Sequence, residues 1–227
     1  IGKADEVITT PISAIATTLA ILAVGAKPVF SDVTSSGLLD SQKIENAITP
    51  ATKAIIPVHL YGQPVNLDIF VKICQKHNLL LLEDACQAHG SSFQNRKLGT
   101  FGKLGCFSFY PTKNLGAFGD GGAITTDDDS LADLCRKIRD YGQEDKYLHT
   151  VYGLNCRLDE IQAGILRVKL KYLDPNNNKR QKLAKRYKEN LQGLNGIEII
   201  EPISWEENNF HLFVIKTKRR DELQKFL

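Results

Sequence analysis

Short apolar segments alternate with amphipathic ones through the first third of the chain. The apolar segments have the length of strands, and they cover residues 6–10, 28–32, 54–58 and 79–82. The segments between them have helical spacing or helix-starting residues, and they cover residues 11–24, 41–48 and 67–77. Because strands and helices alternate, we predict an α/β fold with a mostly parallel sheet flanked by helices. The run of four leucines at 79–82 has the length and position of a strand, which predicts a strand that is buried on both faces despite its leucines.

The second half of the chain has a different pattern. Glycines and short apolar runs between residues 101 and 126 predict further strands joined by tight turns. Longer helices follow, with short strands after them; the helices are expected at 129–140, 157–172 and 175–193 and the strands at 197–200 and 212–216. A break at Asp174-Pro175 predicts that a second, smaller domain begins there, which divides the chain into residues 1–174 and 175–227.

Both ends of the chain are unusual. The sequence contains no Met, opens with a turn that leads into the first strand, and closes inside a helical pattern at residues 221–227. We therefore expect the native protein to extend beyond both ends, so that the N-terminal part of the large domain and most of the small domain lie outside the printed residues.

Composition excludes several classes of partner. With 29 basic and 26 acidic residues the net charge is +3, and no stretch combines dense Lys and Arg with aromatics, so we predict no nucleic-acid partner. No apolar run approaches the roughly 18 residues of a membrane span, and no leader is visible. The five cysteines lack a CxxC pair, which predicts no disulfide framework or metal site and favours the reducing cytoplasm.

The first candidate site follows the leucine strand. Asp84 comes at the expected strand end, and the next six residues include Gln87 and His89. Ligands of parallel α/β sheets gather beyond the carboxyl ends of strands, so a carboxylate, an amide and an imidazole there indicate a site. The alternative is structural, because acidic residues commonly end strands and His89 would then only cap a turn.

The second candidate is the segment Cys106–Gly116, in which Lys113 follows a strand-like run. A buried lysine has a lowered pKa, and its free amine is then available for Schiff-base chemistry. The alternative is a solvated surface lysine, which describes most lysines. The glycines that follow match neither the dinucleotide fingerprint nor the P-loop, so they indicate only tight turns.

Five ordered motifs together resemble the DegT/DnrJ/EryC1/StrS family of sugar aminotransferases. They are Ile56–Pro64, the Glu-Asp-Ala-x-Gln-Ala-His-Gly motif at 83–90, the Cys-Phe-Ser-Phe-Tyr-Pro-x-Lys-Asn-Leu-Gly motif within 102–116, Gly119–Ala123 and Asn155–Ala163. The resemblance runs through nearly the whole chain. It implies the fold of the aspartate aminotransferase class (fold type I), with a large α/β domain that binds pyridoxal 5'-phosphate (PLP) and a smaller α+β domain.

The resemblance also implies roles for four residues of the large domain. Lys113 matches the lysine that holds PLP as a Schiff base and moves the proton during the reaction. Asp84 matches the carboxylate that pairs with the pyridine nitrogen and keeps it protonated, so that the ring accepts electrons. Gln87 matches a residue near the phenolic oxygen of the ring, and Ser108 matches a hydroxyl donor to the phosphate.

Asn155 resembles the asparagine that reaches the cofactor phosphate of the neighbouring subunit. If it does, the active sites are shared and the enzyme is a homodimer. The alternative for Asn155 is the N-cap of the helix that contains Arg157–Lys171. We expect the apolar positions of that helix to be packing residues; they are Leu158, Ile161, Ile165, Val168 and Leu170.

Two departures from the family pattern stand out. Many members place an aromatic ring, stacked on PLP, where this chain has Ala14 in the segment Pro11–Thr17. Another group must therefore cover that face of PLP, or the face stays open. The second departure is the Ser-Gly-Thr phosphate loop of the family, which would lie before Ile1.

By resemblance, we expect an enzyme of amino sugar and glycan biosynthesis. It would transfer an amino group from an amino acid, glutamate, to a nucleotide-linked ketosugar, and the form of the motif at Arg157–Ala163 favours a 3-keto sugar. One alternative is a PLP-dependent sugar dehydratase, although those relatives carry histidine in place of the lysine. Another is a catalytically silent, regulatory relative.

Three further polar residues are candidates, each for substrate contact or for a structural hydrogen bond: His59, Tyr61 and His211.

Overall fold

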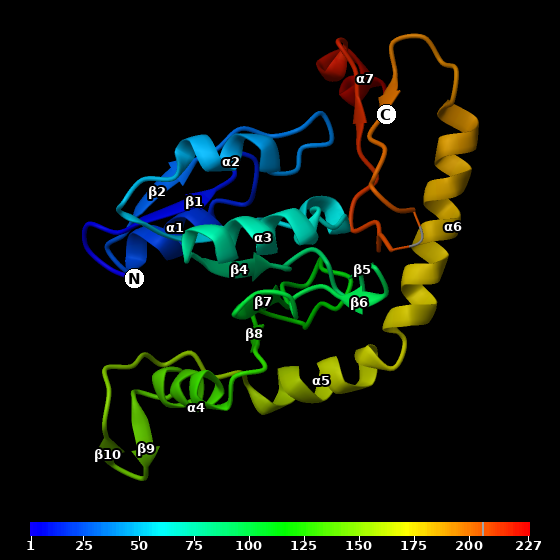
Figure 1. The fold of residues 1–227 in the computed structure, drawn as a ribbon. Helices are drawn as coiled ribbons and strands as arrows, with labels where there is room; N and C mark the ends of the chain where they lie inside the picture. Colours follow the sequence, from blue (N-terminus) through cyan, green and yellow to red (C-terminus); the bar gives the residue numbers. More distant parts are fainter. Residues whose placement is uncertain (206) are drawn as a thin grey trace.

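A six-stranded sheet forms the centre of the computed structural model, which describes residues 1–205 and 207–227 (Figure 1). Its order is β2-β1-β3-β4-β7-β8, and only β7 and β8 pair antiparallel. The strands are β1 (Glu6–Thr9), β2 (Lys27–Phe30), β3 (Thr52–Ile56), β4 (Leu80–Asp84), β7 (Leu104–Ser108) and β8 (Gly122–Thr125). The predicted α/β fold with a mostly parallel sheet is confirmed.

Helices cover the two faces of this sheet unequally. On one face, Ile44 of α2 (Ser41–Ala47) and Phe70 of α3 (Leu67–His77) pack over Ile8 in the main core cluster. On the other face, α1 (Ala16–Ala23) joins a smaller cluster around Val7. Val7 and Ile8 are neighbours in β1, and they reach opposite layers because successive strand side chains point to opposite faces.

The remaining elements are not strands of the six-stranded sheet. They are η1 (Leu60–Gly62), the hairpin β5 (Ser92–Phe93) and β6 (Arg96–Lys97), α4 (Asp129–Ile138), the hairpin β9 (Gln143–Asp145) and β10 (Leu148–His149), α5 (Glu160–Leu170), α6 (Leu173–Leu191), β11 (Glu198–Ile199), β12 (Ile215–Lys216) and α7 (Arg220–Phe226). Figure 1 shows α6 running along one side, from α5 to the C-terminal strands. Because α6 begins at Leu173, the expected break at 174/175 lies in its first turn, and the division into domains stays a prediction.

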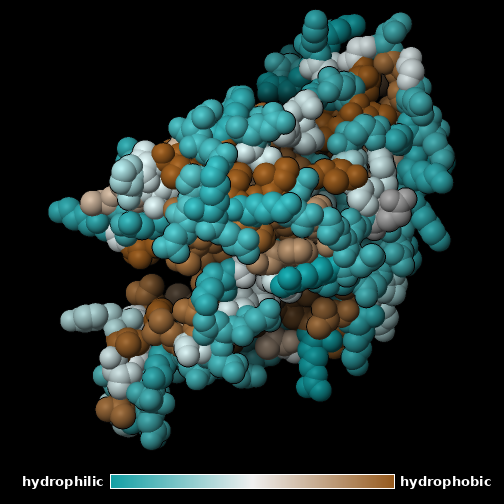
Figure 2. All heavy atoms as spheres, in the orientation of Figure 1, coloured by the Kyte–Doolittle hydropathy of each residue, from teal (hydrophilic) through white to brown (hydrophobic). Residues whose placement is uncertain are grey.

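Two packing predictions are wrong in part for the described residues. In β4, Leu81 and Glu83 are buried and Leu82 on the opposite face packs partly buried against the Val7 cluster, but Leu80 is 43% exposed. Of the predicted packing residues in and before α5, Leu158 packs against a cluster with the buried Leu166, whereas Ile161, Val168 and Leu170 are exposed. Figure 2 shows further hydrophobic side chains exposed over α4 and the β9–β10 hairpin, at the lower left.

None of the helices in residues 1–205 and 207–227 is both long and apolar enough to cross a membrane.

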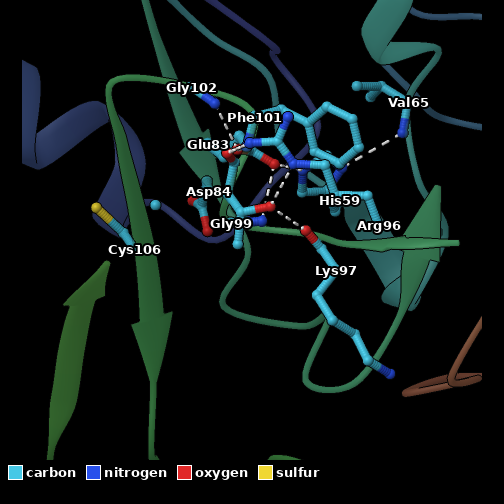
Figure 3. Close-up of polar contacts among 12 residues, drawn as sticks. His59, Val65, Glu83, Asp84, Arg96, Lys97, Gly99, Phe101, Gly102 and Cys106 are labelled. Carbon is cyan, nitrogen blue, oxygen red and sulfur yellow. Dashed lines mark hydrogen bonds and ion pairs between the residues drawn. The ribbon is translucent and has the colours of Figure 1, made fainter. Parts of the chain in front are cut away.

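A buried carboxylate joins β4 to two loops. Glu83 is fully buried, and its Oε1 accepts the N–H groups of Phe101 at 2.6 Å and Gly102 at 2.7 Å. Its Oε2 accepts the Gly99 N–H at 2.8 Å and a hydrogen bond from His59 Nε2 at 3.1 Å (Figure 3). The carboxylate thus fixes both the β6–β7 loop and the residue before η1.

The other nitrogen of His59 determines the tautomer. His59 Nδ1 accepts the Val65 N–H at 3.3 Å, so Nε2 carries a proton and donates it to Glu83. Burial raises the pKa of the Glu83 carboxyl, but the hydrogen bonds from His59, Gly102 and Gly99 outweigh burial and leave that pKa below its usual value. His59 is therefore a structural hydrogen-bonder, which resolves the two alternatives left by the sequence.

A Glu83→Gln variant should unfold more easily, by about 3 kcal/mol at neutral pH, because an amide NH2 would face groups that only donate. In the wild type, the ionised Glu83 carboxylate contributes its full share to the free energy of unfolding above pH 4.5, near the pKa of the unfolded state. This share is lost as the pH falls through the lower pKa of Glu83 in the folded protein. Urea unfolding from neutral to acidic pH measures both effects. The control is Glu45→Gln, because Glu45 is an exposed partner of Lys76 and should change stability little. Equal losses in the two variants would contradict the structural role of Glu83.

Gly62 leaves room for a distant side chain. Its φ is +95°, and a Cβ there would overlap the side-chain oxygen of Asn209. We expect Gly62→Ala to lower the free energy of unfolding by about 3 kcal/mol, from the positive φ and the overlap together. Gly164→Ala in α5 is the control, because a Cβ meets nothing within 4 Å there and alanine should stabilise the helix by about 0.5–1 kcal/mol. Chemical unfolding of both variants tests the pair, and a neutral Gly62→Ala would refute the contact.

Candidate active site

The carboxyl ends of β4 and β7 lie side by side. These strands are parallel, with Asp84 opposite Cys106, and Ser108 ends β7 two residues later. The Asp84 carboxylate and the Ser108 hydroxyl therefore leave the sheet at the same edge, where parallel α/β sheets bind ligands. The expectation that Asp84 comes at the carboxyl end of a strand agrees with this position, while the roles of Asp84 and Ser108 stay predictions.

Two donors orient the Asp84 carboxylate. The Thr17 hydroxyl in α1 donates to Asp84 Oδ2 at 2.6 Å, and the Cys86 N–H donates to Oδ1 at 3.1 Å. Each oxygen keeps a further lone pair, so the carboxylate remains able to accept another hydrogen bond. The sequence analysis missed Thr17, which lies 67 positions earlier. The available signal was three hydroxyl residues, Ser13, Thr17 and Thr18, on an otherwise apolar segment. In the structure Ser13 Oγ lies 3.3 Å from Thr17 Oγ1.

A main-chain donor fixes the amide of Gln87. Its Oε1 accepts the Tyr61 N–H at 2.6 Å, so the NH2 group is left to donate elsewhere. Tyr61 adopts φ 63°, a left-handed conformation within η1. Tyr61 therefore contributes to the site through its main chain, by turning the amide of Gln87.

Lys113 lies in a tight turn after β7. Its N–H donates to the Tyr110 carbonyl at 2.9 Å, and the Ala117 N–H closes the wider loop on the Phe109 carbonyl at 2.7 Å. The Lys113 side chain is partly exposed rather than buried. Ser108 Oγ accepts the Tyr110 N–H at 3.3 Å, which leaves its O–H free to donate.

Two histidines lie within electrostatic reach of Lys113. His89 is buried, and its ring lies 5.4 Å from that of Phe107 and 6.0 Å from that of Phe109. Burial, together with the charge of Lys113, lowers the pKa of His89 to about 4 and has the same effect on His211. Both rings are thus neutral at physiological pH. His89 is a packed interior residue, so the cap of an exposed turn is not its role.

Asn155 lies apart from the other candidates. It forms an isolated β-bridge with Asp140, and its Oδ1 accepts a hydrogen bond from Arg157 Nε at 3.2 Å. Helix α5 begins only at Glu160 and its N-cap is Asp159, so the alternative of Asn155 as N-cap is wrong. Asn155 is exposed, and among the described residues its contacts are with Asp140 and Arg157 rather than with Asp84, Gln87, Ser108 or Lys113. Its side chain is thus available to another molecule.

The chemistry of these groups fits PLP. The cofactor needs an acceptor for its ring N–H, a donor for its phenolic oxygen, a donor for its phosphate and a primary amine for its aldehyde. Asp84, Gln87, Ser108 and Lys113 supply these in that order. Ala14 is exposed and provides no ring, so the structure agrees with the departure seen in the sequence.

The model of the DegT/DnrJ/EryC1/StrS aminotransferase family matches residues 1–227. The chain is 46% identical over 228 residues to the erythromycin biosynthesis sensory transduction protein EryC1 of Saccharopolyspora erythraea, covering 100% of the chain and 62% of that relative. It is 45% identical over 230 residues to the dTDP-3-amino-3,4,6-trideoxy-alpha-D-glucose transaminase of Streptomyces venezuelae, covering 100% of the chain and 60% of the relative.

A solved structure agrees over the same span. The crystal structure of S. venezuelae DesV in complex with a ketimine intermediate superposes with a TM-score of 0.96 at 44% identity, covering 99% of this chain and 61% of that one. The chain thus spans about three fifths of the length of the relatives it matches. With a family model that matches from end to end and a shared fold, the chain belongs to the DegT/DnrJ/EryC1/StrS aminotransferase family.

Proposed function

We propose that the protein is a PLP-dependent aminotransferase that transfers an amino group from glutamate to a nucleotide-linked 3-ketosugar. One observation carries the proposal: Asp84 and Gln87 are already oriented by Thr17, Cys86 and Tyr61, beside the loop of Lys113. Support for the substrate class comes from the relative in S. venezuelae, whose name is that of a 3-amino-sugar transaminase.

Each residue has a defined task in this reaction. The bound cofactor supplies an electron sink for the carbon that loses its proton. Asp84 would hold the proton on the ring nitrogen, and the free NH2 of Gln87 would donate to the phenolic oxygen. Ser108 would bind the phosphate with its hydroxyl. Lys113 would bind the cofactor through its amine and move the proton between the substrate carbon and the cofactor carbon in each half-reaction.

The same proposal includes a homodimer in the cytoplasm. Asn155 is exposed on the part of the fold that also presents Leu154, 66% exposed, and Ile161, 76% exposed. An apolar surface of this kind beside an available amide fits a second subunit whose cofactor phosphate Asn155 would reach. All five cysteines are free thiols, which fits a reducing compartment.

A regulatory role is the second candidate, because a relative at 46% identity carries the name of a sensory transduction protein. Against it, the carboxylate, amide, hydroxyl and amine that PLP needs are all present at one sheet edge. A sugar dehydratase is the third candidate, and Lys113 argues against it because those relatives carry histidine at this position.

Replacing the lysine tests the enzyme. In the full-length protein, Lys113→Ala should lower the formation of 2-oxoglutarate from glutamate and a nucleotide-linked 3-ketosugar by about 1,000-fold or more, because both cofactor attachment and proton transfer are lost. Mass spectrometry after borohydride reduction should place the cofactor on the peptide of Lys113. The control is Lys72→Ala on α3, an exposed lysine that should leave the rate unchanged.

The alternatives give different results in the same assay. Stoichiometric 2-oxoglutarate and amino sugar support transamination, whereas loss of water from the sugar without 2-oxoglutarate supports a dehydratase. A colourless wild-type protein that does not respond to added PLP would support the regulatory role. Cofactor found on another lysine would overturn the assignment of Lys113.

A further inference from the structure

Three asparagines, two buried and one partly buried, are hydrogen-bonded to one another beside the Lys113 loop. This asparagine cluster consists of Asn114, next to Lys113, Asn177 in α6, and Asn209 in the segment before β12. Asn177 is 6% exposed and Asn209 is 1% exposed. Buried amides are costly unless their hydrogen bonds are made, so the contacts of the cluster should be specific.

The cluster binds the main chain of the loop that carries Gln87. Asn209 Nδ2 donates to the carbonyl oxygens of Gln87 at 3.0 Å and His89 at 2.9 Å. Asn177 Nδ2 donates to the same His89 carbonyl at 2.8 Å. Two separate parts of the C-terminal region thus hold one short stretch of the loop.

The cluster also binds the residue next to Lys113. Asn114 Nδ2 donates to Asn177 Oδ1 at 2.9 Å and to the Asn209 carbonyl at 3.1 Å. A carbonyl oxygen can only accept, so these bonds determine which end of the Asn114 and Asn177 amides is the NH2. The amides of Asn114 and Asn177 therefore each have one orientation, and the loop of Lys113 is joined to α6.

The orientation of Asn114 then fixes the tautomer of His211. Asn114 Oδ1 lies 3.1 Å from His211 Nδ1, and because Oδ1 accepts, Nδ1 must carry the proton. The low pKa of His211 agrees with a neutral ring. Nε2 of His211 therefore carries no proton and can accept a hydrogen bond. It lies close enough to Lys113 for the charge of that lysine to lower the pKa of the ring.

Two glycines allow this arrangement. Gly62 leaves room for Asn209, and Gly90, with φ +81°, would bring a Cβ within 2.7 Å of Asn177 Nδ2. Either side chain would push the C-terminal region away from the loops.

We propose that Asn114, Asn177, Asn209 and His211 are positioning residues, which set the places of Lys113 and Gln87 from the C-terminal region of the chain. The expected effect on the reaction rests on the function proposed above. The coupling of the two loops to α6 does not, because it follows from hydrogen bonds within the chain. Any movement of α6 or of residues 208–211 would be transmitted to both loops.

Asn177→Ala tests the coupling, because it removes two hydrogen bonds without changing either loop. The control is Asn176→Ala, a neighbouring exposed asparagine of the same helix. In the cofactor-free full-length protein, hydrogen exchange should become faster in peptides covering residues 85–91 and 110–117 in Asn177→Ala only. Unchanged exchange in those peptides would overturn the proposal, whether or not the protein binds PLP.

The catalytic consequence is measured in the PLP-loaded protein. Asn177→Ala should lower kcat by about tenfold or more with little change in KM for the sugar, because a misplacement of about 1 Å in a reacting group costs up to about 100-fold. The pH at which the absorption band of the bound cofactor changes should also shift. A lower unfolding midpoint with unchanged spectrum and kcat would show a merely structural role and refute the inference.

Two results separate this inference from the proposed function. If wild type shows no transamination but the two loops respond in hydrogen exchange, the function fails and the coupling stands. If Asn177→Ala does not fold, Asn177→Ser keeps a small hydroxyl that can form only one donor bond, and it is measured in the same way. Normal exchange and kcat in Asn177→Ser would also count against the proposal.

Discussion

The buried carboxylate of Glu83 is the contact on which the candidate site depends. Four donors from two loops converge on it, one from His59 and three from the main chain of residues 99–102. A buried carboxylate with fewer partners would strongly destabilise the fold. Displacing any one of these donors therefore lowers the free energy of unfolding, and this keeps the donors in position. This fixes β4 at its carboxyl end, one residue before Asp84.

Adjacent carboxylates on β4 therefore have different tasks. Successive strand side chains point to opposite faces, so Glu83 enters the main core while Asp84 turns toward α1. Glu83 has every acceptor position near a donor, which makes it a fixed part of the framework. Asp84 has one donor on each oxygen and retains the capacity to bind a ligand group. Burial and the number of donors, rather than residue type, separate the structural acid from the chemical one.

Local pattern was sufficient for the alternating strands and helices of the sheet and for the strand end at Asp84, but it missed the short hairpins β5–β6 and β9–β10. The roles expected for Asp84, Gln87, Ser108 and Lys113 came from motif resemblance. What it could not provide were contacts between distant segments. Thr17 reaches Asp84 across 67 positions, and Asn209 reaches Gln87 across 122. The exposure of apolar side chains in α5 could not be predicted either. An apolar pattern looks the same whether the helix packs against its own chain or against another molecule, and Ile161 is exposed in this chain.

Polar burial recurs through the fold with one consistent effect. Glu83 and His59 lock the loops before and after β4, and the asparagine cluster locks the loops of Gln87 and Lys113 to α6. Apolar packing alone tolerates small shifts, whereas a buried hydrogen bond is lost within a fraction of an ångström. A site that must align a carboxylate, an amide and an amine on one ligand gains its precision from such bonds. The partly exposed Lys113 can thus be accurately placed even though its own side chain is held by few neighbours, because the residue that follows it is held by three hydrogen bonds.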